Sequence, residues 1–415
     1  MRMISKKYLA VIVAVILIAA FEFSSFGGSL IRESFSGKTE EDIEPPKETL
    51  TGQKNFSFEL FFEMANSEEY NNLFISPYSI HTALHLAAVG ADGETREEME
   101  EVLRLEGEES KVKASELKDW LEGSSRKNEV SIANSMFLRE NIPFKDTFVE
   151  DGEEYFDAEL DELPETGEPI NEWVKEKTDG KIEELIDPGP IDPLIIAYLV
   201  NAIYFQGVWE TEFDEEDTYP GTFYYGDQEV EVDIMKNQAN YSYHVGEDFK
   251  AVTLEYDSGD YLFNAFVPDR DSSLEDFYEK FDAETYDEVL QKMDEEEIQI
   301  HMPKFTLEGD YDLIGHLKAL GMEKAFKESE ADFSKMVNLE ELGYNVFIDE
   351  VSHGSFIEVD EEGTEAAGST AVGTGRESVG PQVPVIELDR PFFFTIEDPE
   401  TGTILFQGNL EDPSG

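Results

Sequence analysis

The chain has 415 residues, 40% of them apolar, and 95 Asp and Glu against 31 Lys and Arg, which gives a formal net charge of −64. It contains no cysteine, which excludes a disulfide framework and cysteine-ligated metal sites. The acidic excess is spread along the whole chain and leaves no basic patch, so we expect no nucleic-acid partner.

A charge of this size repels itself at low ionic strength and weakens the compact state. At molar salt the Debye length falls to about 3 Å, and the repulsion is screened. We therefore expect a protein adapted to high salt. No convincing linker interrupts residues 53–415, so we expect a single large domain there.

The N-terminal 27 residues have a basic start, with Arg2, Lys6 and Lys7, followed by an apolar run over residues 8–21. This pattern predicts a signal peptide or an N-terminal membrane anchor, and the sequence leaves both open. Residues 28–52 are polar and acidic and contain Pro45-Pro46, which predicts a disordered tether. We expect an extracellular or surface-anchored protein whose contact with the membrane is limited to the N-terminal segment.

Periodicity predicts helices early in the chain and strands late, which favours an α+β fold. The second helix has Ser76 as its cap and Pro77 in its first turn, and Thr95 is expected to cap the third. The expected helices are 56–64, 77–89, 95–103, 170–178, 274–293 and 314–320. The expected strands are 130–138, 197–205, 222–225, 229–235, 251–256, 261–268, 298–305, 346–348, 355–359, 383–388, 392–396 and 403–407.

A run of small residues lies between two of the late strands. It begins Glu361-Glu362-Gly363-Thr364-Glu365-Ala366-Ala367-Gly368-Ser369-Thr370. Composition alone favours a flexible linker. However, Thr364, Ala366 and Thr370 lie an even number of residues apart, so one face of the segment is compatible with a strand.

This run resembles the hinge of the reactive loop of serpins, the serine-protease inhibitors. Further resemblance lies in His353, in Arg390-Pro391-Phe392-Phe393-Phe394, and in segments 72–83, 90–95, 199–213, 301–307 and 401–408. The resemblance implies a serpin fold, with helices packed around a large central β-sheet plus two smaller sheets, and an exposed reactive loop at about 361–382. It also implies a monomer without cofactor, metal or catalytic group of its own.

In serpins a protease cleaves the reactive loop, and the loop then inserts into the central sheet while the acyl-enzyme is trapped. The hinge that enters the sheet would be Gly363, Thr364, Glu365, Ala366, Ala367, Gly368 and Ser369. The side chains on its inward face are small, and no proline occurs between Gly363 and Pro381, as insertion into a sheet requires. A loop that never inserts would instead indicate a non-inhibitory serpin-fold binding or chaperone protein. A surface structural protein is a third alternative.

Counting as in the family places the scissile bond at Glu377–Ser378, which implies a target that cleaves after acidic residues. The rival bond, Arg376–Glu377, implies a trypsin-like target. Because the loop is a few residues longer than expected, a later bond and a subtilisin-like protease also stay open.

Other residues match polar positions of the serpin sheet. Ser76, Ser79, Asn201 and His353 would lie where the central strands part and could latch the sheet through hydrogen bonds. Trp209, Lys304 and Glu361 would lie at the end of the sheet where insertion begins.

Motifs of common hydrolases and phosphate-binding loops are absent. His81 and His85 are four residues apart, which is more typical of a helix face than of a metal site.

Overall fold

The computed structural model describes residues 50–413, except 68–69, 108, 124–127, 141, 227 and 365–382. The N-terminal leader, residues 28–49 of the expected tether, the hinge from Glu365 onward and the expected scissile bonds lie outside the described residues. Residues 50–52, expected to belong to the tether, instead begin a helix that continues to Ala65. Within the described part of the chain, no helix has the length and apolar character needed to span a membrane.

One sheet has six strands and contains the candidate site. Its strand order is β10 (Phe305–Asp312), β11 (Glu350–Val359), β12 (Gly363–Thr364), β4 (Ala197–Val208), β2 (Glu129–Leu138) and β3 (Glu159–Glu162). Strands β4 and β11 are parallel and pair directly over residues 198–203 and 350–355. The short strand β12 lies between them at one end of the sheet.

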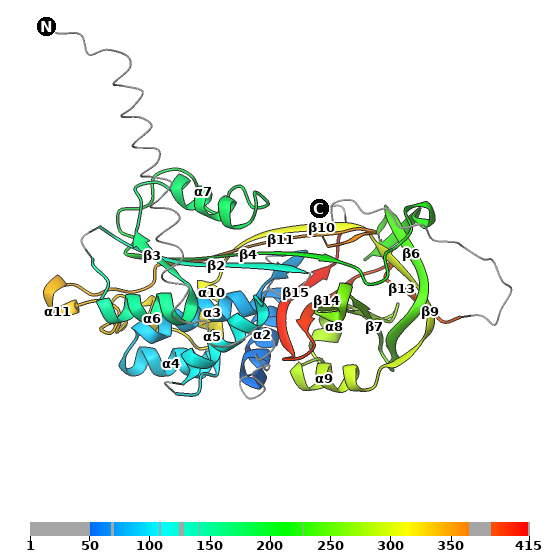
Figure 1. The fold of residues 1–415 in the computed structure, drawn as a ribbon, viewed down its shortest axis with the longest axis horizontal. Coiled ribbons are helices and arrows are strands. Elements are labelled where there is room, and N and C mark those ends of the chain that lie inside the picture. The colour runs from blue at the N-terminus through cyan, green and yellow to red at the C-terminus, as the bar shows by residue number, and fades with distance from the viewer. Residues whose placement is uncertain are drawn as a thin grey trace, which may run out of the picture. The chain divides into compact units, whose positions relative to one another are not determined.

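Both faces of this sheet are covered, which explains the continuous apolar run in β4. Leu199 packs into the large core formed with the N-terminal helices, whereas Val200 packs into a smaller cluster with Ile170 and Val174. Figure 1 shows the corresponding layers, with α3, α5 and α6 on one side of the sheet and α7 on the other. Hence a polar side chain of β4 is covered by helices, whichever face of the sheet it lies on.

The remaining strands form one hydrogen-bonded sheet of nine strands, in which the two smaller sheets of the expected fold are joined through the 18-residue strand β6. The order is β1 (Leu73–Ile75), β15 (Thr403–Leu410), β14 (Phe392–Asp398), β8 (Leu262–Pro268), β7 (Phe249–Glu255), β6 (Gln228–Val245), β9 (Asp294–Pro303) and β13 (Val385–Glu387), with β5 (Tyr219–Tyr225) paired to β6.

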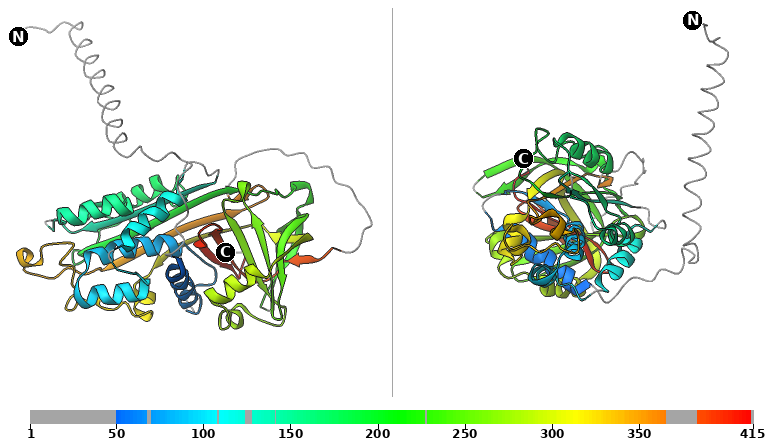
Figure 2. Two further views of the ribbon diagram at one scale, coloured as in Figure 1. Left: turned by 60° about the horizontal axis from the view of Figure 1, so that its bottom comes forward. Right: turned by 90° about the vertical axis from the view of Figure 1, so that its left-hand side faces the viewer.

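The helices confirm the α+β fold class. In chain order they are α2 (Leu50–Ala65), α3 (Pro77–Gly90), α4 (Gly93–Leu103), α5 (Ser110–Leu121), α6 (Asp146–Phe156), α7 (Glu168–Lys177), α8 (Leu274–Tyr278), α9 (Ala283–Gln291), α10 (Ile314–Ala319) and α11 (Leu339–Leu342). Figure 2 shows most N-terminal helices, in blue and cyan, gathered along one part of the six-stranded sheet, and the green and yellow strands of the nine-stranded sheet at its other end.

Four expected features differ in the structure. The strand expected over 298–305 ends at Pro303, and Phe305 begins a second strand in the other sheet. Asp92, not Thr95, precedes the first residue of α4, and the buried Thr95 hydroxyl instead accepts a hydrogen bond from the Asp332 amide at 2.9 Å. The single helix expected over 274–293 is two helices, because Asp282 caps a new helix by accepting from the Thr285 amide. Residues 346–348 form no strand, although the side chains of Val346 and Ile348 are buried.

Candidate functional site

A tight turn leads the chain from β11 into the space between β11 and β4. The Asp360 amide donates to the Gly363 carbonyl at 3.0 Å, which closes the turn. The Asp360 carboxylate accepts from the amides of Glu362 and Gly363 at 2.9 and 3.2 Å. The turn therefore satisfies its own backbone donors, and the next residues point back along the sheet.

The two residues that follow the turn already form a strand of the sheet. Thr364 is paired with Gly207 of β4 and with Val359 of β11, and both pairings are antiparallel. A Cβ atom at Gly363 would lie 2.1 Å from the Gly207 carbonyl oxygen, and its φ is +155°. Only glycine fits this approach of two backbones.

Aromatic residues lie against β12 and the turn before it. The Tyr256 hydroxyl lies 2.7 Å from the Thr364 hydroxyl, and Trp209 stacks on Tyr256 with ring centroids 4.5 Å apart. Trp209 also holds the turn, because its indole N–H donates to the Asp360 carbonyl at 3.0 Å and its amide to the Glu362 carbonyl at 2.9 Å. Tyr256 ends an ordinary apolar strand pattern, so nothing in the sequence distinguishes it as a site residue.

Lys304 and Glu361 form the ion pair expected at this end of the sheet, with Nζ 2.6 Å from Oε2. The other carboxylate oxygen of Glu361 accepts from the Thr218 hydroxyl at 2.7 Å. Burial, the largest single influence, opposes ionisation of Glu361, but the hydrogen bonds from Lys304 and Thr218 together hold its pKa below the usual value. The Glu361 side chain is 8% exposed and the Lys304 side chain 39%, so solvent still reaches the cation.

Farther along the sheet, His353 and Asn201 bond across the seam between β11 and β4. The Ser76 amide donates to His353 Nε2 at 3.0 Å, so the ring proton resides on Nδ1, which donates to Asn201 Oδ1 at 2.6 Å. Burial lowers the pKa of His353 to about 3, so the ring is neutral at physiological pH.

The same cluster extends to a third strand and to helix α3. The Asn201 side-chain NH₂ donates to Asn134 Oδ1 of β2 at 2.7 Å and to the Ser79 hydroxyl. The Ser76 hydroxyl accepts from the Ser79 amide, which caps α3, and donates to the Leu405 carbonyl at 2.6 Å. We call Ser76, Ser79, Asn134, Asn201 and His353 the latch.

The structure thus brings together the four latch residues singled out from the sequence, and the three residues expected at the end where insertion begins. It adds Asn134 to the latch, and it places Tyr311 against the His353 ring, with centroids 6.2 Å apart. Within the described ranges, no cluster of three or more His, Asp or Glu side chains is suited to hold a metal ion. Hinge residues Glu365–Ser369 and the candidate scissile residues Arg376, Glu377 and Ser378 lie outside the described part of the chain.

Comparison with protein families matches residues 51–413 to the family described as Serpin (serine protease inhibitor). Serpin B8 of Bos taurus is 35% identical over 373 residues, which cover 86% of this chain and 97% of that protein. An uncharacterized serpin-like protein of Thermococcus kodakarensis is 32% identical over 386 residues, covering 88% of this chain and 86% of its own length.

Solved structures give the same answer for the fold. The native state of the thermophilic serpin tengpin superimposes with a TM-score of 0.80 at 27% identity, covering 91% of this chain and 99% of that one. Native protease nexin-1 with heparin has a TM-score of 0.78 at 26% identity, covering 87% and 98% of the two chains.

Proposed function

Because this chain belongs to the serpin family, whose members are generally protease inhibitors, we propose that it inhibits a serine protease as a suicide substrate. In this proposal the protease cleaves the reactive loop and forms an acyl-enzyme. The cleaved loop then inserts between β4 and β11 and carries the protease along the sheet. About 14 inserted residues at about 3.3 Å each would span roughly 45 Å.

The observation that carries the proposal is the position of β12. Gly363 and Thr364 already pair with β4, and Thr364 also pairs with β11, at one end of the gap; both pairings are antiparallel. Beyond them, β4 and β11 pair with each other, so the sheet is closed. A cleaved loop would lengthen a strand whose first two residues are in place, and it would do so by separating β4 from β11.

Extending the pairing register of β12 along β4 and β11 predicts which residues the inserted loop would contact. If each further residue takes the next pairing position, Thr370 lies opposite Asn201 on one side and His353 on the other. Insertion of a strand doubles the separation of β4 and β11 from about 4.8 to about 9.6 Å, so Asn201 and His353 can no longer bond directly. The Thr370 hydroxyl would lie between them and take over both hydrogen bonds.

For the target, we propose cleavage at Glu377–Ser378 by a glutamyl endopeptidase. Arg376–Glu377 with a trypsin-like protease and a later bond with a subtilisin-like protease are the alternatives. We further propose a monomer that acts outside the cell, secreted or anchored through its N-terminal segment, in a medium of high salt. The apolar run after Lys7 and the net charge of −64 support these two points.

The test is a denaturing gel of the full chain mixed, in high salt, with a glutamyl endopeptidase, trypsin and a subtilisin in turn. A covalent band at the summed mass of inhibitor and protease is expected with one of them. Mass spectrometry of the released C-terminal peptide then identifies the scissile bond from its first residue. Cleavage of the loop without such a band for all three would overturn the proposal and favour a non-inhibitory serpin.

A further inference from the structure

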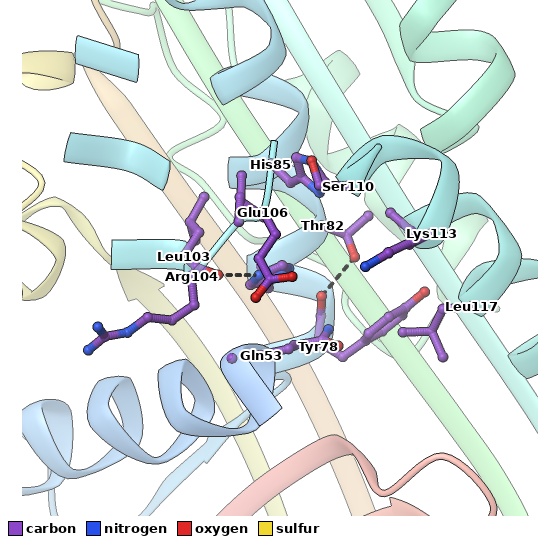
Figure 3. Close-up of a pocket in the computed structure, with 14 residues that line it drawn as sticks. Gln53, Tyr78, Thr82, His85, Leu103, Arg104, Glu106, Ser110, Lys113 and Leu117 are labelled. Carbon is purple, nitrogen blue, oxygen red and sulfur yellow. Dashed lines mark hydrogen bonds between the residues drawn. The ribbon is translucent and has the colours of Figure 1, made fainter. Parts of the chain in front are cut away.

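A cavity of about 240 Å³ lies among the N-terminal helices, away from the sheet opening. Figure 3 shows it bounded by α3 and α5 and by the end of α4. Its lining comes from the start of α2, four positions of α3, the segment 103–106 and four positions of α5. The volume lies just below the roughly 300–1,000 Å³ of sites for drug-sized ligands, so a smaller molecule would fill it.

The inner wall is uncharged. Leu103 and Leu117 supply buried apolar surface, and two buried histidines of α3 complete it. Burial lowers the pKa of His81 to about 4 and that of His85 to about 3, so both rings are neutral at physiological pH. His81 Nε2 donates to the Leu103 carbonyl at 2.9 Å, and His85 Nε2 is 2.9 Å from the Ser110 hydroxyl. The part of this wall formed by Leu103 and Leu117 suits the apolar body of a ligand.

The mouth of the cavity carries charge. Figure 3 shows Lys113 extending from α5 toward Thr82 of α3. Among the described residues, no carboxylate lies within ion-pair distance of Lys113, whereas its neighbour Lys111 on the same helix is paired with Asp151 at 2.6 Å. The other cation of the lining, Arg104, is already paired with Glu59 at 2.9 Å. Glu106 also lines the cavity and would repel an anion placed near it. A bound anion is therefore directed to Lys113.

We propose that this cavity is a binding site for a small apolar molecule with a single carboxylate group. The apolar body occupies the space against Leu103 and Leu117, and the carboxylate accepts a charge-assisted hydrogen bond from Lys113 Nζ. The overall negative field of the protein disfavours non-specific adsorption of such an anion. Binding consequently depends on this one cation and on the shape of the cavity.

The site is mechanically connected to the latch through α3. Tyr78, His81, Thr82 and His85 of the lining all belong to this helix. The N-terminal end of the same helix carries the latch residues Ser76 and Ser79. A ligand that contacts both α3 and α5 would restrain α3 and stabilise the closed sheet. This consequence for inhibition rests on the proposed function, whereas binding itself does not.

The test uses the full chain in 2 M NaCl with 3-phenylpropionate as the probe and 3-phenylpropionamide as its uncharged analogue. Saturation-transfer NMR measures binding of each, and amide hydrogen exchange of residues 77–90 measures the response of α3. Two variants test the site: Lys113→Gln removes the cation, and Ala114→Trp fills the cavity. Lys118→Gln is the matched control, because Lys118 is on α5 but does not line the cavity.

We expect the acid to bind and the amide to bind several-fold more weakly, with the same loss for the acid in Lys113→Gln, because 2 M salt screens part of the attraction to Lys113. Binding should be abolished in Ala114→Trp and unchanged in Lys118→Gln. Equal binding of acid and amide, or binding insensitive to Lys113→Gln, would overturn the site even if Ala114→Trp failed to fold. Bound acid that leaves exchange in α3 unchanged would overturn the link to the latch. No protease is needed, so failure of the proposed function would be seen separately.

Discussion

The hydroxyl groups of Tyr256 and Thr364 lie 2.7 Å apart, and both side chains are fully buried. One belongs to the body of the protein and the other to the start of the reactive-loop segment. Under the proposed mechanism, loop insertion starts at Thr364, so the size and polarity of this side chain should limit further entry.

Replacing Thr364 with arginine should convert an inhibitor into a substrate. The buried site beside Tyr256 has no room or counter-charge for a guanidinium, so the hinge would be expelled from the sheet. On a denaturing gel with the target protease, the cleaved monomer should increase several-fold at the expense of the covalent complex. Tyr256→Phe is the matched control: it loses one hydrogen bond, about 1 kcal/mol, and should still form the complex. An unchanged yield of complex in Thr364→Arg would contradict insertion at this point.

Thr370→Val tests the register proposed for the inserted loop. Valine has nearly the same shape but lacks the hydroxyl that would bridge Asn201 and His353. The thermal midpoint of the native state should stay unchanged, whereas the cleaved form should lose about 1–3 kcal/mol of stability and the fraction of trapped protease should fall. Ser369→Ala, which removes a hydroxyl from the opposite face, should change neither quantity. A cleaved form whose stability is unchanged by Thr370→Val would show that the register is wrong.

Much of the fold and part of the site follow from the sequence, and the failures have physical reasons. The apolar run of β4 and the cap at Ser76 are local signals, so β4 and α3 could be predicted closely. Strand β1, of three residues, is too short to produce a period. Val346 and Ile348 alternate as in a strand, but a loop buries both without a ladder. An alternating apolar pattern indicates that every second side chain is buried, and a loop can bury side chains in this way as well as a strand can.

The latch illustrates the same limit. Asn201 interrupts an otherwise apolar strand, and a polar residue there must find partners, which makes it predictable. Asn134 lies in a strand of mixed polarity, where an asparagine is indistinguishable from a solvent-facing residue. Its burial arises from the pairing of β2 with β4 and from the helices packed on that face. Sequence patterns within one strand do not contain that information.

The latch histidine predicts how stability depends on pH. The unfolded His353 has a pKa near 6.5, whereas the buried ring has a pKa of about 3, so below pH 6.5 the unfolded chain binds a proton that the native state does not. Stability is therefore lost as the pH falls, by about 1.4 kcal/mol per unit for this group. In urea unfolding, the advantage of the wild type over His353→Gln should shrink by about 2 kcal/mol between pH 7 and pH 5.

Ser79→Ala provides the control for this experiment. It removes a latch hydroxyl but no titratable group, so its difference from the wild type should not change with pH. If the difference in unfolding free energy between the wild type and His353→Gln were also independent of pH, the native ring would bind a proton as readily as the unfolded one.

Glu397 predicts the opposite pH dependence. Its side chain is 4% exposed, and burial raises its pKa to about 7 despite the opposing effect of Lys54. Among the described residues, its Oε2 atom has no hydrogen-bond partner. Because the native pKa exceeds the unfolded value, stability from this group is lost as the pH rises toward 7. Glu397→Gln should therefore stabilise the protein by up to about 3 kcal/mol at pH 8 and little at pH 5. Exposed Glu400→Gln should have little effect at either pH, and an equal gain at both would contradict the argument.

Salt should stabilise this protein through screening. With a net charge of −64, repulsion among carboxylates opposes the compact state, and it weakens as the Debye length falls from about 10 Å at 0.1 M to about 3 Å at 1 M. The thermal midpoint should rise by several degrees between 0.1 and 2 M NaCl, equally in KCl, and more than in sucrose of the same osmolarity. The same screening weakens the Lys304–Glu361 pair, whose cation is partly exposed, so Lys304→Gln should destabilise the protein more at 0.1 M than at 2 M. A midpoint that is flat or falls with salt would contradict adaptation to a saline medium.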